Sequence, residues 1–339
     1  MKKILTVTVP SYNVERFLEQ TLESFVDEQI MEDIEVLVVD DGSRDRTAKI
    51  GREFAEKYPD TFRVISKENG GHGSTINRGI EEASGRYFKV VDGDDWVFTE
   101  GLRELVSLLK ECRADYVFTN YYEVNDVTGE KKEVCFPGIP VCREFSFDKI
   151  AKTTDIPMHA LVIRTGLLKE HGVRMDEHCF YVDVEYILYP VPYIEKVVYY
   201  DIFVYMYRLA QTEQSVSIKG YQRHIQDHIK VILHTLDYIE GYKSQKGADK
   251  RKIYYMERRI AEMVYTQTDI FLSFSLRQRE IRRQFKAFDR MIKEKNQGVY
   301  LKSGSYSGML RMLRRTGFRF YRLIIMLSRL RNRQEDSRI

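Results

Sequence analysis

The sequence has few cysteines and no long apolar run. Its four cysteines, Cys112, Cys135, Cys142 and Cys179, form no CxxC pair and show no cysteine–histidine spacing suited to zinc. This pattern favours ordinary thiols in a reducing compartment over a disulfide framework. No stretch approaches the ~20 consecutive apolar residues that a membrane-spanning helix needs. We therefore expect the catalytic part of the chain to be soluble.

The beginning of the chain also lacks the features of a secretory signal peptide. Two lysines and an apolar run open "MKKILTVTVPSYN", but Pro10 and Asn13 cut the run short and no small-residue cleavage site follows. The segment is typical of a first β-strand. We expect a cytoplasmic protein.

Acidic residues are missing from one segment near the C-terminus. The 339-residue chain has a net charge of only +3, yet residues 302–333 contain Lys302 and eight arginines without an acid. Three explanations are open: a basic helix packed on the protein body, a nucleic-acid contact, or an amphipathic helix on an anionic membrane. Phe318, Phe320 and residues 323–327 add apolar area to the positive charge, which is the combination that interfacial helices need. We therefore predict contact with an anionic membrane surface and no nucleic-acid partner.

Apolar β-branched runs of strand length alternate with helix-like segments at the start of the chain. We expect strands at residues 4–10, 34–40, 62–66 and 86–91, and helices at 14–28, 45–58 and 74–84. This alternation predicts a mostly parallel mixed sheet flanked by helices, in which ligands bind beyond the carboxyl ends of the strands. The fold class is therefore α/β.

The pattern becomes purely helical from about residue 218. Before that point we expect one more helix at residues 99–112 and a strand at 114–126. Beyond it, apolar residues recur at helical spacing within 221–239, 253–270 and 281–292, which predicts three amphipathic helices. We expect a first domain over residues 1–217 and a helical C-terminal region with a basic amphipathic tail over 218–339.

Three carboxylates follow the fourth strand-like run. Asp92, Asp94 and Asp95 lie within "KVVDGDDWVF", and like charges this close raise one another's pKa unless a cation or hydrogen-bond donors compensate. An EF-hand is excluded, because Trp96 and Arg103 would occupy its fifth and twelfth positions. Oxygen ligands suit Mg²⁺ and Mn²⁺. We therefore predict a divalent cation at this turn.

The glycine-rich segment "NGGHGSTINRG" is neither a P-loop nor a dinucleotide fingerprint. It has no GK[ST], and Ile76 stands where GxGxxG needs its third glycine. Its backbone N–H groups can still approach a ligand. His72 is either a ligand contact or a structural residue of the loop.

Five motifs together resemble those of family 2 glycosyltransferases, which have the A-type nucleotide-sugar-binding fold. They are "VPSYN", "VVDDGSRDRT", "NGGHGSTINRGI", "VVDGDDW" and "FYVDVEYIL", in the order of that family and within roughly the first 215 residues. The resemblance implies a nucleotide-sugar half over residues 1–115 and an acceptor half over 116–217. It also implies a metal-dependent, inverting sugar transfer from a nucleotide sugar, with a UDP-sugar favoured.

The same resemblance implies a bacterial enzyme that extends a glycan, lipid-linked or envelope polysaccharide acceptor. Such an enzyme would lie on the cytoplasmic face of the cell membrane. The sugar, the linkage and the oligomeric state do not follow from the sequence.

The resemblance also assigns roles to individual residues. Tyr12 would stack on uracil and Asp41 would accept its imide N–H, whereas the structural alternatives are a tyrosine packed on the sheet and a helix N-cap. Asp92 and Asp94 would hold Mn²⁺ or Mg²⁺, with Asp94 the direct ligand. Asp95 would hold a sugar hydroxyl or a metal-bound water.

Asp183 of "FYVDVEYIL" matches the general base of the family. Val182 replaces the glutamate that many relatives carry before this aspartate. Ile76 likewise replaces an arginine of the glycine loop, although Asn77 and Gly79 remain. A diphosphate or base contact would then come from elsewhere, for which His72 is a candidate.

"YMYRLAQTEQSVSI" resembles the segment that lies over the donor diphosphate, with Arg208, Ser215 and Ser217 as candidates. The complete donor-binding set that the resemblance implies is Pro10, Tyr12, Asp41, Asn69, Gly71, Asn77, Asp92, Gly93, Asp94, Asp95, Arg208 and Ser215.

Three other functions are open alternatives. A nucleotidyltransferase would carry a glycine-rich basic loop after the first strand, which "VPSYNVERF" lacks. A receiver domain would need an aspartate after the third strand, where "FRVISKENGG" has none. A catalytically inactive glycosyltransferase-like subunit is disfavoured because Asp94 and Asp183 are intact.

Overall fold

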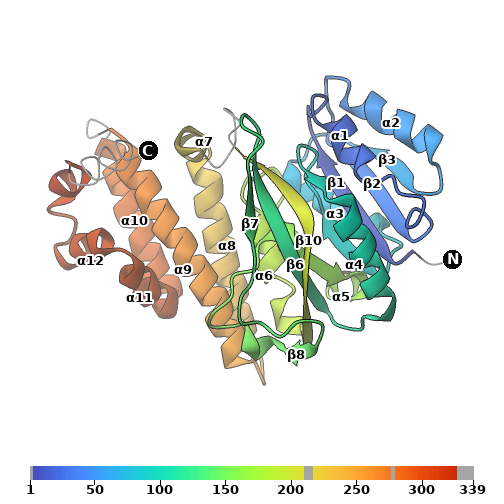
Figure 1. The fold of residues 1–339 in the computed structure, drawn as a ribbon. Coiled ribbons are helices and arrows are strands. Elements are labelled where there is room, and N and C mark those ends of the chain that lie inside the picture. Colours follow the sequence, from blue (N-terminus) through green and yellow to red (C-terminus); the bar gives the residue numbers. More distant parts are fainter. Residues whose placement is uncertain (1–2, 210–216, 276–278, 327–339) are drawn as a thin grey trace. The chain divides into compact units, whose positions relative to one another are not determined.

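A computed structural model describes residues 3–209, 217–275 and 279–326 of the chain. The chain divides into two compact units, one up to residue 212 and one from residue 213. Figure 1 shows the first unit as a sheet with helices and the second as helices only. The predicted α/β fold followed by a helical region is confirmed.

The first unit contains a mixed sheet of ten strands. Its main path runs β3 (Phe62–Ser66), β2 (Ile34–Asp40), β1 (Leu5–Ser11), β4 (Tyr87–Val90), β9 (Leu161–Arg164), β6 (Tyr116–Asn125), β10 (Lys196–Leu209) and β5 (Trp96–Val97). Off this path, β7 (Lys131–Val134) pairs with β6, and β8 (Glu144–Ser146) pairs with β10. The four strands from β3 to β4 are parallel, and β9 is antiparallel to both β4 and β6. The predicted strands thus form one parallel half.

Helices flank this sheet. They are α1 (Leu18–Glu23), α2 (Thr47–Lys57), α3 (His72–Glu82), α4 (Thr99–Glu111), α5 (Thr165–Glu170) and α6 (Asp183–Leu188), with short 3₁₀ helices η1 (Phe147–Lys149), η2 (Met158–Ala160) and η3 (Val191–Tyr193). Among them, α2 packs on β3, α3 on β1 and α4 on β10.

The first predicted helix is much shorter than expected. Residues 14–28 were expected to be helical, but α1 spans only Leu18–Glu23. The backbone N–H of Val14 bonds the Thr47 hydroxyl at 2.9 Å, and that of Glu15 bonds an Asp45 carboxylate oxygen at 3.1 Å. The loop after β2 and the first residue of α2 therefore bind the backbone donors near the start of this segment.

The central strand β1 is buried on both faces. Leu5, Val7 and Val9 have no exposed surface, and neither do Thr6 and Thr8. Strands that are covered on both sides form rigid supports for the loops at their ends. The loop that follows β1 therefore starts from a fixed position.

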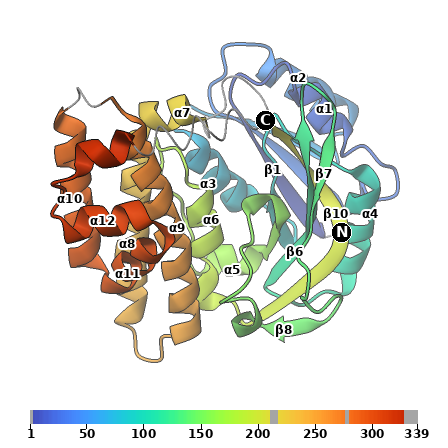
Figure 2. The ribbon, with the colours of Figure 1, turned by 60° about the vertical axis from the view of Figure 1, so that its left-hand side comes forward.

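The second unit consists of helices, and Figure 2 shows the longer ones side by side. They are α7 (Ile218–Arg223), α8 (Ile225–Lys243), α9 (Lys250–Ser273), α10 (Arg279–Lys295), α11 (Gln297–Tyr306) and α12 (Gly308–Arg315). The three predicted amphipathic helices are confirmed as α8, α9 and α10. Their core includes Leu236, Ile260 and Phe285, which are essentially buried.

The basic segment is partly internal to this second unit, which corrects one expectation. Phe318, Ile324 and Ile325 were expected on an exposed apolar face, but they are only 3%, 1% and 0% exposed. The Phe318 ring packs edge-on against Phe285 at 5.1 Å. Arg314 pairs with Asp289 at 2.7 Å and lies over the Tyr300 ring. The explanation of a helix packed on the protein therefore holds for this part of the tail.

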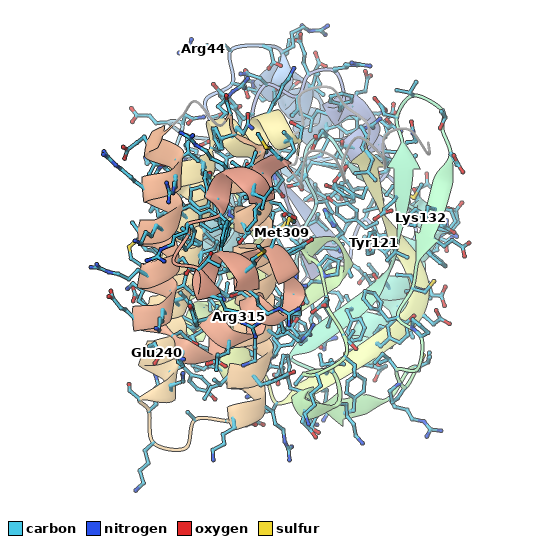
Figure 3. All side chains as sticks on the ribbon, turned by 90° about the vertical axis from the view of Figure 1, so that its left-hand side faces the viewer. Arg44, Tyr121, Lys132, Glu240, Met309 and Arg315 are labelled. Carbon is cyan, nitrogen blue, oxygen red and sulfur yellow. The ribbon has the colours of Figure 1, made fainter. Side chains whose placement is uncertain are left out.

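Other residues of the segment remain on the surface. Phe320, Leu323 and Met326 are 49%, 46% and 55% exposed. Figure 3 labels Met309 and Arg315, which mark the α12 side of the unit. Residues 327–333, which contain Leu327 and the last arginines of the segment, lie outside the described residues.

Within the described ranges, no helix has both the length and the apolar character needed to cross a membrane. All four cysteines lie in these ranges and none forms a disulfide. Cys112 and Cys179 are buried, whereas Cys135 and Cys142 are exposed.

Candidate functional site

The carboxyl ends of β1, β2 and β4 meet at one edge of the sheet. Ser11 at the end of β1 pairs with Asp40 at the end of β2, and Thr8 pairs with Val90 at the end of β4. The residues that follow these strands, Tyr12, Asp41 and Asp92, therefore belong to the same edge. The Tyr12 side chain is 48% exposed there, so it is not the packed tyrosine of the alternative interpretation.

Asp41 anchors the glycine-rich loop. Its Oδ1 accepts hydrogen bonds from the Lys67 Nζ at 2.7 Å and the Gly70 N–H at 2.9 Å. Its Oδ2 accepts from the Gly71 N–H at 2.8 Å, and its backbone carbonyl accepts from the Asn69 amide at 3.0 Å. Because α2 begins only at Thr47, Asp41 is not a helix N-cap. Its carboxylate instead fixes residues 69–71.

The glycine loop packs closely against residues 175–179. Gly71 has a φ of 82°, which is strained for other residues, and a Cβ on it would lie 3.3 Å from the His178 backbone. The Asn77 side chain donates to the Met175 carbonyl at 2.9 Å and accepts from the Met175 N–H at 2.8 Å. The structure thus shows Asn77 holding this neighbouring loop, and its contact with the donor stays a prediction.

The aspartate turn is packed tightly onto the end of β1. A Cβ at Gly93 would lie 2.8 Å from the Pro10 carbonyl oxygen, so this position has room only for glycine. The Thr21 hydroxyl donates to the Gly93 carbonyl at 3.1 Å and the Asp95 carbonyl at 2.6 Å. These contacts fix the backbone that carries Asp92.

Asp95 and Arg208 tie this turn to β10. The carboxylate of Asp95, only 2% exposed, accepts from the Tyr205 hydroxyl at 2.6 Å and the Arg208 N–H at 2.7 Å. The Arg208 guanidinium lies over the Trp96 ring and donates through Nε to the Asp94 carbonyl at 2.6 Å. It also donates to Asp126 and to Gln20. Both side chains therefore position the turn, and the expected donor contacts of Arg208 and Asp95 stay predictions.

Asp92 and Asp94 experience unfavourable electrostatics. Burial, and then the charges of Asp94 and Asp183, raise the pKa of Asp92 well above its usual value. Burial also raises the pKa of Asp94, although its own backbone N–H and the Arg208 charge oppose the shift. Among the described residues, Asp92 Oδ1 is buried without a hydrogen-bond partner. A divalent cation bound to these oxygens would remove the repulsion, so the residues present fit such an ion.

His72 and Asp183 lie close to these carboxylates. The His72 Nε2 atom is 3.5 Å from Asp92 Oδ1 at the start of α3. Burial lowers the pKa of His72, and the negative charge of Asp183 is the largest opposing influence. Asp183 is the first residue of α6 and its side chain is exposed. The acids of two distant motifs are thus within electrostatic reach of each other.

Sequence reasoning missed His159. One ring nitrogen of His159 and one carboxylate oxygen each of Asp92 and Asp95 lie within 4.8 Å of one another. Its ring stacks on Tyr207, with the ring centroids 4.0 Å apart. Burial and the nearby Lys89 charge lower the pKa of His159 to about 3, so the ring is neutral at physiological pH. A single histidine in "IPMHALV" carries no local signal for this position.

The last motif also supplies two serine candidates, Ser215 and Ser217. Ser215 lies outside the described residues. Ser217 caps α7 in the second unit, where its hydroxyl accepts the Gly220 N–H at 3.1 Å. The donor contacts of Ser215 and Ser217 stay predictions.

Residues 6–171 match the model of the family described as glycosyl transferase family 2. This matched part of the chain belongs to the family. Among curated relatives, glycosyltransferase GlyA of Streptococcus pneumoniae is 29% identical over 60% of this chain and 30% of its own length. The uncharacterized glycosyltransferase EpsJ of Bacillus subtilis is 36% identical over 36% of this chain and 35% of its own length. The chain thus matches about a third of the length of these relatives.

The fold also resembles a solved structure over nearly the whole chain. The crystal structure of S. aureus TarS 1–349 in complex with UDP-GlcNAc has a TM-score of 0.67 and 20% identity, covering 96% of this chain and 92% of that one. At this identity the similarity shows a shared fold. The resemblance inferred from the motifs is therefore confirmed at the level of family and fold.

Proposed function

We propose that this chain is a glycosyltransferase that moves a sugar from a nucleotide sugar to an acceptor hydroxyl with inversion at the anomeric carbon. The main support is the convergence of the Asp92–Asp95 turn, the glycine loop at residues 69–73 and Asp183. The first two segments lie within the matched family domain, and Asp183 lies beyond its end at residue 171.

A UDP-sugar is the proposed donor. The exposed Tyr12 ring offers a face on which the base can stack, and Asp41 would complete the base site beside the glycine loop. The TarS structure contains UDP-GlcNAc, which supports a uridine nucleotide without identifying the sugar. Pro10, Asn69, Gly71, Asn77 and Gly93 shape the backbone around this position.

The proposed cofactor is Mn²⁺ or Mg²⁺, held by Asp92 and Asp94. Such a cation, when bound, neutralises charge on the departing diphosphate. The protein itself supplies the fixed turn, because Tyr205 and Arg208 hold its backbone and Asp95.

Asp183 is the proposed general base. Its carboxylate takes the proton from the acceptor hydroxyl while that oxygen bonds to the anomeric carbon and the bond to the diphosphate oxygen breaks. A base and acceptor on the face opposite the leaving group give inversion. The Asp183 side chain is exposed at the start of α6.

The proposed acceptor is a glycan, lipid-linked or envelope polysaccharide at the inner face of the cell membrane. Phe320, Leu323 and Met326 are exposed beside Arg319 and Arg322 in the second unit. This combination supports attachment to anionic lipid.

A panel of nucleotide sugars tests the proposed activity. Each is incubated with the full chain and Mn²⁺, and the released nucleoside diphosphate is measured, since slow hydrolysis needs no acceptor. We expect release from one nucleotide sugar above the rest, loss of this release in Asp94→Asn and retention in the exposed control Asp60→Asn. Release from none of them would favour an inactive binding subunit.

A further inference from the structure

We propose that His159 is a nitrogen ligand of the divalent cation at the aspartate turn. The cation site would then combine carboxylate oxygens with one imidazole from the acceptor half of the domain. This inference rests on the proposed function, because it assumes that a cation binds at Asp92. It adds a residue that none of the five sequence motifs contains.

The geometry places a ring nitrogen of His159 near the carboxylates of Asp92 and Asp95. Its ring nitrogen and the oxygens of Asp92 and Asp95 lie within 4.8 Å of one another. With metal–ligand bonds of ~2.1 Å, two atoms on opposite sides of one ion are ~4.2 Å apart, so a shift below ~1 Å brings all three into range. Asp92 Oδ1, buried without a hydrogen-bond partner among the described residues, is available as a ligand.

Neighbouring groups hold the imidazole in this position. The ring stacks on Tyr207 and meets Tyr205 edge-on at 4.9 Å. The backbone carbonyl of His159 accepts a hydrogen bond of 2.7 Å from the Nζ of Lys89, a fully buried residue of β4. Lys89 lies three positions before Asp92 in the sequence. Strand β4 therefore both positions the Asp92 carboxylate and holds the backbone of η2, which contains His159. Metal-binding histidines commonly have their orientation fixed by such surrounding contacts.

His72 is the competing imidazole, because its Nε2 atom is 3.5 Å from Asp92 Oδ1. It approaches from α3, on the side of the glycine loop, whereas a ring nitrogen of His159 lies within 4.8 Å of a carboxylate oxygen of both Asp92 and Asp95. An imidazole near two carboxylates is better placed to complete a coordination shell than one near a single carboxylate. His72 therefore serves as the matched control.

Electron spin echo spectroscopy of bound Mn²⁺ tests the proposal without any turnover. Mn²⁺ alone is added to the full chain, so no nucleotide nitrogen is present. We expect nitrogen-14 modulation from a directly bound imidazole in the wild type and in His72→Asn, and its loss in His159→Asn. Mn²⁺ affinity, from room-temperature titration of the free-ion signal, should fall ~10-fold or more in His159→Asn.

The outcomes separate this proposal from the proposed function. Mn²⁺ binding without nitrogen modulation in the wild type would overturn the His159 assignment and leave the carboxylate site standing. Modulation that survives in His159→Asn and disappears in His72→Asn would assign the ligand to His72 instead. Failure of the wild type to bind Mn²⁺ would overturn both. His159→Gln is the second variant, and thermal unfolding of each protein checks that it is folded.

Discussion

The Tyr205 hydroxyl bridges Asp92 and Asp95, the two ends of the aspartate turn. It donates to Asp95 Oδ2 at 2.6 Å and accepts the Asp92 N–H at 3.2 Å. Burial and these acids raise the pKa of Tyr205 well above its usual value, so the hydroxyl keeps its proton. The last long strand of the sheet thereby sets the position of the turn.

Tyr205→Phe should destabilise the protein. The change leaves a buried Asp95 oxygen without its donor, which costs ~1–3 kcal/mol. Urea unfolding of the wild type and variant measures the difference. Tyr122→Phe is the control, because Tyr122 stacks on Phe203 through its ring alone. Equal losses in the two variants would show that the bridge contributes nothing.

Asp94→Asn should remove the metal dependence of nucleotide binding. We expect the wild type to bind UDP at least ~10-fold more tightly with Mn²⁺ than with a chelator, as measured by calorimetry. The variant should bind UDP equally in both conditions. A variant that keeps the full wild-type ratio would remove Asp94 from the proposed cation site.

Asp183→Asn should lose transfer by ~10²-fold or more while donor binding survives, because the amide cannot accept the acceptor proton. Kinetics and UDP-sugar calorimetry separate the two effects. The anomeric configuration of the product, read by NMR, should be inverted relative to the donor. A retained configuration would contradict the direct attack assigned to this base.

The stability of the second unit should fall as the pH is lowered from 6.5 to 4. His228 is 3% exposed, and its Nδ1 lies 2.8 Å from Gln267 Oε1. Burial lowers its pKa to about 4, with the Gln267 contact opposing the shift. The unfolded chain, with the ordinary histidine pKa of ~6.5, binds more protons in this window, so stability rises with pH there and falls with acid.

His228→Gln should reduce this pH dependence by an amount on the order of 3 kcal/mol. Urea unfolding at pH 4 and pH 7 gives the difference for each protein. His234→Gln, at an exposed position of the same helix α8, should keep the wild-type slope. An unchanged slope in His228→Gln would mean that another group controls the acid response.

The sequence predicted the parallel half of the sheet because each of its strands is a short run rich in apolar and β-branched residues that ends in a motif. Asp41, Asp92 and Asp183 could be named for the same reason. His159 and Lys89 could not, since their meeting depends on an antiparallel strand, β9, inserted between β4 and β6. The first predicted helix was too long, because the side chains of Thr47 and Asp45 accept hydrogen bonds from the backbone N–H groups of its first two residues. These side chains are about 30 residues further along the chain, so the local sequence does not reveal the contacts.

The exposed apolar side chains of the basic tail should bind an anionic membrane. Truncation near residue 300 would remove Phe318 and Arg314 from the second unit, so point variants are the better test. We expect the full chain to cosediment with anionic liposomes at low salt. Replacing Phe320, Leu323 and Met326 together with serine should weaken this binding, because these apolar side chains would enter the headgroup boundary.

Two controls distinguish insertion into the lipid headgroup region from nonspecific adsorption to liposomes. Leu301→Ser removes a side chain that is 62% exposed on α11, in the same unit, and should leave cosedimentation unchanged. Arg319→Gln with Arg322→Gln should weaken binding to anionic liposomes and have no effect on neutral ones, since each basic residue contributes ~1 kcal/mol near anionic lipid. If the triple serine variant partitions like the wild type, residues 320–326 do not contact the membrane and the proposed location should be abandoned.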